Sequence, residues 1–328
     1  MIITPHLEFL DLRHFRAHDL RALLQEEEGL WRERLRWDYG NSSSLLQQYI
    51  DSGLLTGYVA TDQGKAQGFT FSVQEDTKAI VGDVFATRAG DGGVNAPGME
   101  DRLLEHLLET LLHTPGVDRI EAQFMLHDHD THRAPFERAG ARIFPRLFLE
   151  LDLMSWAGPS TPPHNGTRLL GDALYLRHWT EADFVPAART IAAAYAGHID
   201  GTINDQYNSV AGAQNFLHNV VHFPGCGTFE PGASWVVSGQ ENGSPQALLL
   251  ASRISADTGH ITQVCVLPGL RGRHVGRGLM DASAASLRQL GCTAVTLTVT
   301  EANRTAVELY RKLGYRVRHV FDAMLWTV

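Results

Sequence analysis

A short loop in the second half of the chain combines glycines with arginines. It follows a strand-like run that ends at Pro268, and residues 269–278 read Gly-Leu-Arg-Gly-Arg-His-Val-Gly-Arg-Gly. Glycines permit positive φ and let successive backbone N–H groups face one concavity. A helix that starts behind them adds the positive end of its dipole. Arg271, Arg273 and Arg277 supply charged, forked donors for phosphate oxygens. The loop therefore predicts a diphosphate-binding site.

Two other phosphate-binding loops do not fit this segment. The dinucleotide fingerprint needs its glycines after the first strand of a parallel βαβ unit, whereas Gly276 and Gly278 are followed by Leu279, Met280 and Asp281. The P-loop needs a Gly-Lys-Ser/Thr run, and the chain contains none. A connecting loop with solvated arginines remains the alternative interpretation.

A second motif lies one strand further along, in the order Asn303-x-x-Ala306-x-x-x-Tyr310. Together with Arg273-x-x-Gly276-x-Gly278 it resembles the paired signatures of the GNAT superfamily of N-acetyltransferases, over roughly residues 174–328. The resemblance implies acetyl-CoA or coenzyme A as the acyl-donor substrate, with a pantetheine arm inserted between two parting strands, and no metal. The cofactor-binding residues that it implies are Val264, Cys265, Val266, Arg271, Gly272, Arg273, His274, Val275, Gly276, Arg277, Gly278, Asn303 and Ala306.

By the same resemblance, Tyr310 is the general acid that protonates the departing CoA thiolate. A core tyrosine on an apolar helix face is the alternative interpretation. Many family members carry a carboxylate on the strand before the loop as a base, but residues 261–264 read Ile-Thr-Gln-Val. The candidates for a base are therefore Glu301 and the segment that contains His198 and Asp200.

That polar segment follows the first helix of the second half, where the family shapes its acceptor pocket. We expect it to line a pocket for an ammonium or a polyhydroxy amine, although a solvated loop rich in turn-forming residues is equally compatible with it. The residues concerned are His198, Asp200, Asn204, Asp205 and Tyr207.

The elements that must position these residues follow from hydrophobic periodicity and turn signals. We predict helices over 183–195, 276–290 and from Asn303 to Gly314, and strands over 234–238, 247–254, 259–268, 293–300, 316–321 and 323–328. The fold class is α+β or mixed α/β, with two tandem GNAT-like domains, each a twisted, mostly antiparallel sheet flanked by helices.

The first half resembles the second without its chemistry. Residues 136–142 (Phe-Glu-Arg-Ala-Gly-Ala-Arg) align with residues 310–316, so Phe136 falls on Tyr310, and the glycine-rich stretch 87–98 lacks Arg-x-x-Gly-x-Gly. We predict a degenerate GNAT-like domain over 1–156, a linker rich in Pro, Gly and Ser over 157–173, and a catalytic domain over 174–328.

Histidines and carboxylates also cluster at residues 127–132, which read His-Asp-His-Asp-Thr-His. The metallo-hydrolase pattern His-x-His-x-Asp-His needs an aspartate where Thr131 stands. We therefore expect a solvated loop rather than a metal site.

Bulk composition limits the partners. The 28 basic and 37 acidic residues give a net charge of −9, which disfavours nucleic acid and anionic membrane surfaces. Three widely spaced cysteines, no leader-like N-terminus and no long apolar run predict a cytoplasmic protein, monomeric or homodimeric. The predicted function is transfer of an acyl group, acetyl in the first instance, to a primary amine of a small molecule. The alternatives are a non-catalytic acyl-CoA sensor and a protein N-acetyltransferase.

Overall fold

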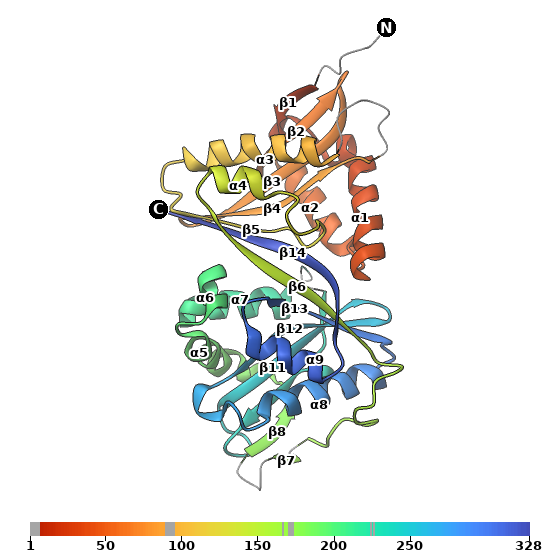
Figure 1. Ribbon diagram of the computed structural model, residues 1–328, viewed down its shortest axis with the longest axis vertical. Coiled ribbons are helices and arrows are strands. Elements are labelled where there is room, and N and C mark those ends of the chain that lie inside the picture. Colours follow the sequence, from red (N-terminus) through yellow and green to blue (C-terminus); the bar gives the residue numbers. More distant parts are fainter. Residues whose placement is uncertain (1–6, 89–95, 166, 170–173, 224, 226) are drawn as a thin grey trace. The chain divides into compact units, whose positions relative to one another are not determined.

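The computed structural model describes residues 7–88, 96–165, 167–169, 174–223, 225 and 227–328 (Figure 1). Contacts divide the chain into two compact units, which we call the first unit (Met1–Arg146 with Val320–Val328) and the second unit (Leu147–His319). Both are mixed α/β. Among the described residues, no helix has the length and apolar character needed to cross a bilayer.

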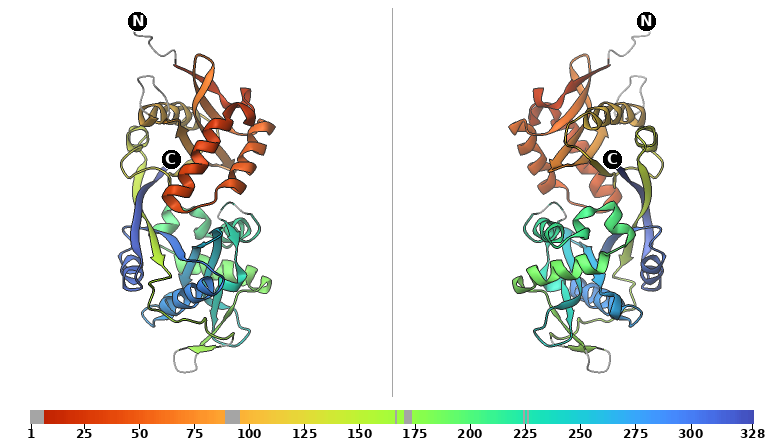
Figure 2. Two further views of the ribbon diagram at one scale, coloured as in Figure 1. Left: turned by 90° about the vertical axis from the view of Figure 1, so that its right-hand side faces the viewer. Right: turned by 90° about the vertical axis from the view of Figure 1, so that its left-hand side faces the viewer.

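The first unit is built on a mostly antiparallel sheet. Its strands follow in the order β1-β2-β3-β4-β5, and the end of β14 then pairs antiparallel with β5. The bounds are β1 Leu7–Asp11, β2 Thr56–Asp62, β3 Lys65–Glu75, β4 Lys78–Ala86, β5 Arg119–Gln123 and β14 Arg316–Thr327. Helices α1 (Arg21–Leu35) and α2 (Gly40–Ser52) lie on one side of these strands, and α3 (Ala96–Leu112) and the short α4 (Arg133–Arg138) on the other (Figure 2).

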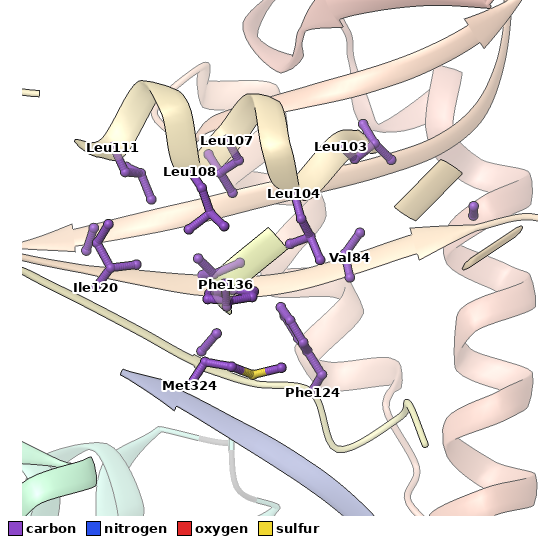
Figure 3. Packing of buried hydrophobic residues seen from close by; sticks show 14 of the residues in the cluster. Val84, Leu103, Leu104, Leu107, Leu108, Leu111, Ile120, Phe124, Phe136 and Met324 are labelled. Carbon is purple, nitrogen blue, oxygen red and sulfur yellow. The ribbon is translucent and has the colours of Figure 1, made fainter. Parts of the chain in front are cut away.

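The leucines of α3 close the core of this unit (Figure 3). Leu103, Leu104, Leu107 and Leu108 are fully or almost fully buried at helical spacing. They face Phe136 from α4, with Phe124 and Met324 beneath it. This packing fixes α3 and α4 relative to the sheet.

The second unit has a similar plan. Its strands run in the order β6-β13-β12-β11-β10-β8-β7, with β9 on the side of β11. The bounds are β6 Arg142–Asp152, β7 Thr167–Leu169, β8 Leu174–His178, β9 Thr228–Phe229, β10 Trp235–Ser238, β11 Pro245–Ser255, β12 Thr258–Val266 and β13 Ala294–Thr300.

Helices cover both faces of this second sheet. On one face, α5 (Phe184–Tyr195) and α7 (Val210–His222) pack on Val236, Leu248 and Cys265. On the other face lies α8 (Val275–Gln289), where Ser286 accepts a hydrogen bond from the indole of Trp235. The remaining helices are α6 (Ile199–Ile203) and α9 (Arg304–Lys312).

Most predicted elements of the second half are present, with shifts of one or two residues at their ends. The two predicted final strands form one continuous strand, β14. We expected a break at Asp322, but its carbonyl oxygen accepts from the N–H of Phe124 at 3.3 Å and its carboxylate binds Arg133. The contact-based units begin and end at 146/147 and 319/320, and the predicted linker 157–173 falls within the second unit. The domain assignment 1–156, 157–173 and 174–328 stays a prediction.

The structure corrects one expectation for the first half, and another falls mostly outside the described residues. The solvated loop expected at 127–132 is wrong for two of its histidines, since His127 and His132 are 7% and 2% exposed. They are buried because each finds polar partners inside the unit. Most of the glycine-rich stretch 87–98, namely residues 89–95, lies outside the described residues.

Replacement of Phe136 by alanine should destabilise the first unit by about 3–5 kcal/mol, because the ring is buried among leucines and leaves a cavity. Urea unfolding followed by circular dichroism measures the loss. Leu54→Ala is the matched control, since its side chain is 74% exposed and its removal should change stability by less than about 0.5 kcal/mol. Equal effects of the two substitutions would contradict this description of the core.

Candidate functional site

The parallel pair β12 and β13 separates part of the way along its length. The two strands pair only from Thr258 to Ile261 and from Ala294 to Leu297. However, β12 continues to Val266 and β13 to Thr300. The separation coincides with a bulge, because Leu250 pairs with Gln263 and Ala251 with Ile261, which leaves Thr262 as the extra residue. The side of Thr262–Val266 that faces β13 therefore carries backbone groups without a strand partner.

The arginine-glycine loop connects the end of β12 to α8. A 3-10 turn at Pro268–Leu270 leads into Gly272 (φ 73°) and His274 (φ 61°), both in the left-handed region. No side chain caps the N-terminus of α8. The first N–H groups of this helix therefore point out of the loop as free donors, as an anion would require.

Gly276 lies in the first turn of this helix and is not demanded by packing. A Cβ atom there would meet the side chains of Leu309 and Val266 at ordinary contact distances of 3.6 and 3.8 Å. The backbone has negative φ, so a larger residue would not be strained. The absence of a side chain keeps the approach to the helix N-terminus open.

The three arginines of the loop differ in their surroundings. Arg271 donates from Nη2 to the carbonyl oxygen of Ala194 (2.6 Å) and from Nε to that of Val266 (3.3 Å). It thereby anchors the loop to α5 and β12. Arg277 lies 3.5 Å from Asp281, one helical turn away. Arg273 is exposed and makes no hydrogen bond or ion pair with any described residue. Arg273 is thus the arginine whose donors are available to a ligand.

Tyr310 lies in α9 with its ring buried, in contact with the ring of Tyr315 at a centroid distance of 5.8 Å. Burial, reinforced by the negative charge of Asp200, raises the pKa of Tyr310 above its usual range. The phenol is therefore protonated at neutral pH and can act as a donor. Asp200 lies near Tyr310 in the fold, although the two residues are 110 positions apart in the sequence.

Asp200 itself is held at the end of β13. Its Oδ1 accepts a hydrogen bond from the hydroxyl of Thr300, and Oδ2 lies 3.4 Å from Nδ1 of His198. His198 also accepts from the backbone N–H of Asp200 and so begins α6. This geometry fixes the carboxylate beside the separated strands.

Tyr195 and Gln263 complete the polar group at this place. The hydroxyl of Tyr195 donates to Oε1 of Gln263 at 2.7 Å, and Nε2 of Gln263 is buried without a hydrogen-bond partner among the described residues. Burial raises the pKa of Tyr195, and the charges of Tyr207, Cys265, Asp200 and Tyr310 act in the same direction.

Sequence reasoning did not select Tyr195 or Thr300 for the site, and Gln263 entered it only as a missing carboxylate. Gln263 could have been recognised, since it lies on the strand before the loop, where a base was sought. Tyr195 and Thr300 end a predicted helix and a predicted strand, and no local pattern marks them.

The other predicted residues lie at defined positions. Asn303 caps α9 through its Oδ1, which accepts from the N–H of Ala306 at 3.3 Å. Asn204 caps the turn that contains Asp205 and Tyr207, and the ring of Tyr207 stacks on Tyr195 at 4.5 Å. Glu301 lies in the turn after β13 and makes no hydrogen bond or ion pair with a described residue. The structure therefore brings Asp200 to the site and supplies no contact that joins Glu301 to it.

A cavity of about 940 Å³ lies elsewhere in the second unit. It shares Arg277 with the loop, but neither Tyr310 nor Asp200 lines it. Its charges are mixed: Arg277, Lys312, Arg316 and Arg318 face Glu150, Asp152 and Asp281. The parted strands, rather than this cavity, therefore form the candidate site.

Comparison with known proteins connects this site to one family. The profile of the acetyltransferase (GNAT) family matches residues 217–315. Over 170 residues the chain is 28% identical to a mycothiol acetyltransferase of Propionibacterium freudenreichii subsp. shermanii. The match covers 50% of this chain and 49% of that protein. The chain thus spans about half the length of that relative.

Solved structures show the same fold over nearly the whole chain. A GCN5-related N-acetyltransferase from Sphaerobacter thermophilus matches with a TM-score of 0.64 at 15% identity, covering 98% of this chain and 95% of that one. A tandem GNAT protein from the clavulanic acid biosynthesis pathway matches with a TM-score of 0.58 at 14% identity, covering 98% of both chains. The predicted tandem GNAT-like fold is confirmed.

Cys265 should be inert in the folded protein, although it lies in the separated part of β12. Burial raises its pKa to about 12 and also raises the pKa of Cys292, so only about 1 in 10⁴ Cys265 thiols is ionised at pH 8. Iodoacetamide labelling with peptide mass mapping should find both thiols unmodified until urea is added. Fast labelling of Cys265 in the native protein would show that its thiol is accessible and ionised, and would contradict this prediction.

Proposed function

Because residues 217–315 form a domain of the GNAT acetyltransferase family, we propose that the second unit transfers an acyl group from CoA to a primary amine of a small molecule. The observation that carries this proposal is the early separation of β12 and β13 beside an uncapped helix N-terminus. Tyr310 and Asp200 flank the same gap from α9 and α6. A binding slot and proton-transfer groups thus converge in one place.

Binding of the donor follows from the chemistry of this surface. The backbone N–H groups of Val264 and Val266 have no partner strand on the side of β13 and are suited to the carbonyl groups of a pantetheine arm, while the carbonyl oxygens of Val264 and Val266 accept from Tyr195 and Arg271. The N-terminus of α8 and the free guanidinium of Arg273 are suited to the diphosphate. Arg271 acts indirectly in this proposal, since its bonds to Ala194 and Val266 hold the loop in shape.

Transfer requires two proton movements. The neutral amine attacks the thioester carbon, a C–N bond forms, and the C–S bond breaks. Tyr310 gives its phenolic proton to the leaving sulfur, and the nitrogen loses its extra proton to Asp200 as the C–N bond forms. Proton return from Asp200 to the phenolate, directly or through water, restores both groups, so the products are an amide and free thiol.

The acceptor is proposed from the charge and size of the residues near the gap. Asp200 provides a fixed negative charge for an ammonium, and the stacked rings of Tyr195 and Tyr207 provide an apolar wall. The likeness to a mycothiol acetyltransferase supports a small molecule as the acceptor, although it covers only half of each chain. Acetyl-CoA incubated with a panel of amines, followed by mass spectrometry, tests this proposal. CoA binding without transfer to any amine would instead favour a sensor.

The double substitution Arg273→Ala with Gly276→Asp should abolish CoA binding. A carboxylate at residue 276 would repel the diphosphate at the helix N-terminus, while the space around Gly276 allows the variant to fold. Isothermal titration calorimetry should give one site per wild-type chain and no measurable heat of binding for the variant.

Gly276→Ala is the control for this experiment, since a methyl group makes only ordinary contacts there and should weaken binding far less than aspartate. Unchanged CoA affinity of the folded double variant would place the donor site elsewhere.

Removal of one oxygen tests the acid role. Tyr310→Phe should keep the fold and the CoA affinity, because the phenol donates no hydrogen bond to a described residue and the ring contacts stay. Turnover should fall by roughly 10²–10⁴, the usual contribution of a positioned proton donor. An acyl donor with a more acidic leaving thiol should reduce this defect, since its thiolate needs less protonation.

Tyr315→Phe is the matched control, a buried tyrosine whose ring touches that of Tyr310. It should retain nearly full turnover. If Tyr310→Phe also turns over at the full rate, the proton reaches sulfur by another route, and the proposed CoA-binding site is unaffected by that result.

A further inference from the structure

The first unit separates its own parallel strand pair in the same way. β4 pairs with β5 only from Lys78 to Val81, and β4 continues to Ala86. A bulge again marks the place, because Phe71 pairs with Asp83 and Ser72 with Val81, leaving Gly82 extra. Here, however, side chains of the unit itself occupy the separated edge.

Two of these side chains bond to the backbone of β4. Nε2 of His127 lies 2.9 Å from the carbonyl oxygen of Val84, and Oε1 of Glu100 accepts from the N–H of Ala86 at 3.0 Å. His127 and Glu100 thus bond to the edge of β4 that corresponds to the separated edge of β12 in the second unit. The remaining atoms of these two groups are left to face each other and His132.

Three potential ligand atoms converge at this point. Nε2 of His132 lies 3.1 Å from Nδ1 of His127 and 3.3 Å from Oε2 of Glu100, and the third side of the triangle is 3.8 Å. The point equidistant from the three atoms is about 2.0 Å from each, which is the length of a Zn–N or Zn–O bond. All three residues are buried.

The outer hydrogen bonds aim the lone pairs inward. A carbonyl oxygen only accepts, so Nε2 of His127 carries the proton that Val84 receives, and Nδ1 is left unprotonated. Nδ1 of His132 donates to Oδ1 of Asp101 at 2.8 Å, so Nε2 is the atom that offers a lone pair when the ring is neutral. A carboxylate or carbonyl behind each histidine is the arrangement that metal-binding histidines have.

Two imidazole nitrogens and a carboxylate oxygen lie within 3.8 Å of one another, a spacing that requires a proton or a cation between them. A proton on Nε2 of His132 would satisfy one of its two neighbours, Nδ1 of His127 or Oε2 of Glu100. A divalent cation accepts all three lone pairs at once.

We propose that Glu100, His127 and His132 bind a divalent transition-metal ion of the zinc type in the first unit, with water as the fourth ligand. The ion joins α3 to the loop before α4 and closes the separated edge of β4. Its ligands are distant in sequence from the residues proposed for acyl transfer, and the role of the ion is structural.

A second group of carboxylates and histidine in this unit does not compete for this role. His129, Asp130 and Asp322 also lie close together, but Arg133 already supplies the positive charge there, bonding to Asp322 at 2.8 Å.

Metal analysis of the whole chain tests the proposal. Protein purified without chelator and without a metal-affinity step should contain about one zinc per chain by plasma mass spectrometry. After the metal is stripped, Zn²⁺ should raise Tm by roughly 5 °C at saturation, and Co²⁺ should bind with the visible absorption of a tetrahedral site.

Four variants separate metal binding from a plain hydrogen-bonded cluster. Glu100→Gln and His132→Gln should lose the Co²⁺ spectrum. Asp101→Asn keeps all three ligands and should weaken binding by roughly 10–100-fold, as loss of an outer carboxylate does. His113→Gln, a histidine at the exposed end of α3, should match the wild type.

Absence of bound metal together with no saturable Zn²⁺ or Co²⁺ binding would overturn the proposal. So would equal metal affinity in His132→Gln and the wild type. If Glu100→Gln or His132→Gln fails to fold, the graded loss in Asp101→Asn still decides the question, because that side chain lies partly at the surface.

Discussion

Both units are governed by the same constraint, which is that a backbone N–H or C=O group taken out of a sheet must find another partner. In each unit a bulge, at Thr262 or at Gly82, releases the parallel neighbour after four residue pairs. In the second unit the freed edge of β12 lies beside an uncapped helix, and its carbonyl oxygens at Val264 and Val266 accept from Tyr195 and Arg271. In the first unit His127 and Glu100 bond to the freed edge of β4. The proposed donor site uses this edge in the second unit, whereas side chains of the first unit occupy the corresponding place.

The helix that follows the separated strands shows the same divergence. Phe136 and Tyr310 precede identical turns: the residue five positions on donates to their carbonyl oxygens, at 2.9 and 3.0 Å, and Gly140 and Gly314 adopt positive φ. Phe136 packs into the leucine core of α3. Tyr310 instead has its hydroxyl in the field of Asp200. A common backbone therefore serves packing in one unit and carries the proposed proton donor in the other.

Local patterns allowed much of this to be predicted from the sequence. The β12–loop–α8 segment and the cap at Asn303 depend on residues within a few positions of each other, so spacing alone indicates them. The contact of Arg271 with Ala194 joins residues 77 positions apart, and no spacing rule predicts it. The burial of His127 and His132 likewise depends on Glu100 and Val84, in other elements of the unit. The continuous β14 was missed because Asp322 resembles a turn residue until its partner Arg133 is known.

The position of Asp200 also limits how it can act. A primary ammonium is a far weaker acid than a carboxylic acid, so a carboxylate does not readily take a proton from the free ammonium. Attack on the thioester reverses the order of acidity. The attacking nitrogen becomes bonded to a tetrahedral carbon that bears an oxyanion, and it becomes a much stronger acid as that carbon collapses to an amide. In the proposed mechanism, Asp200 therefore attracts and orients the amine before attack and accepts the proton only afterwards. Burial, with the charge of Asp200 acting in the same direction, raises the pKa of Tyr310 and keeps the phenol protonated. Glu301, which the structure joins to neither group, offers no such coupling, and this difference favours Asp200 as the partner of Tyr310.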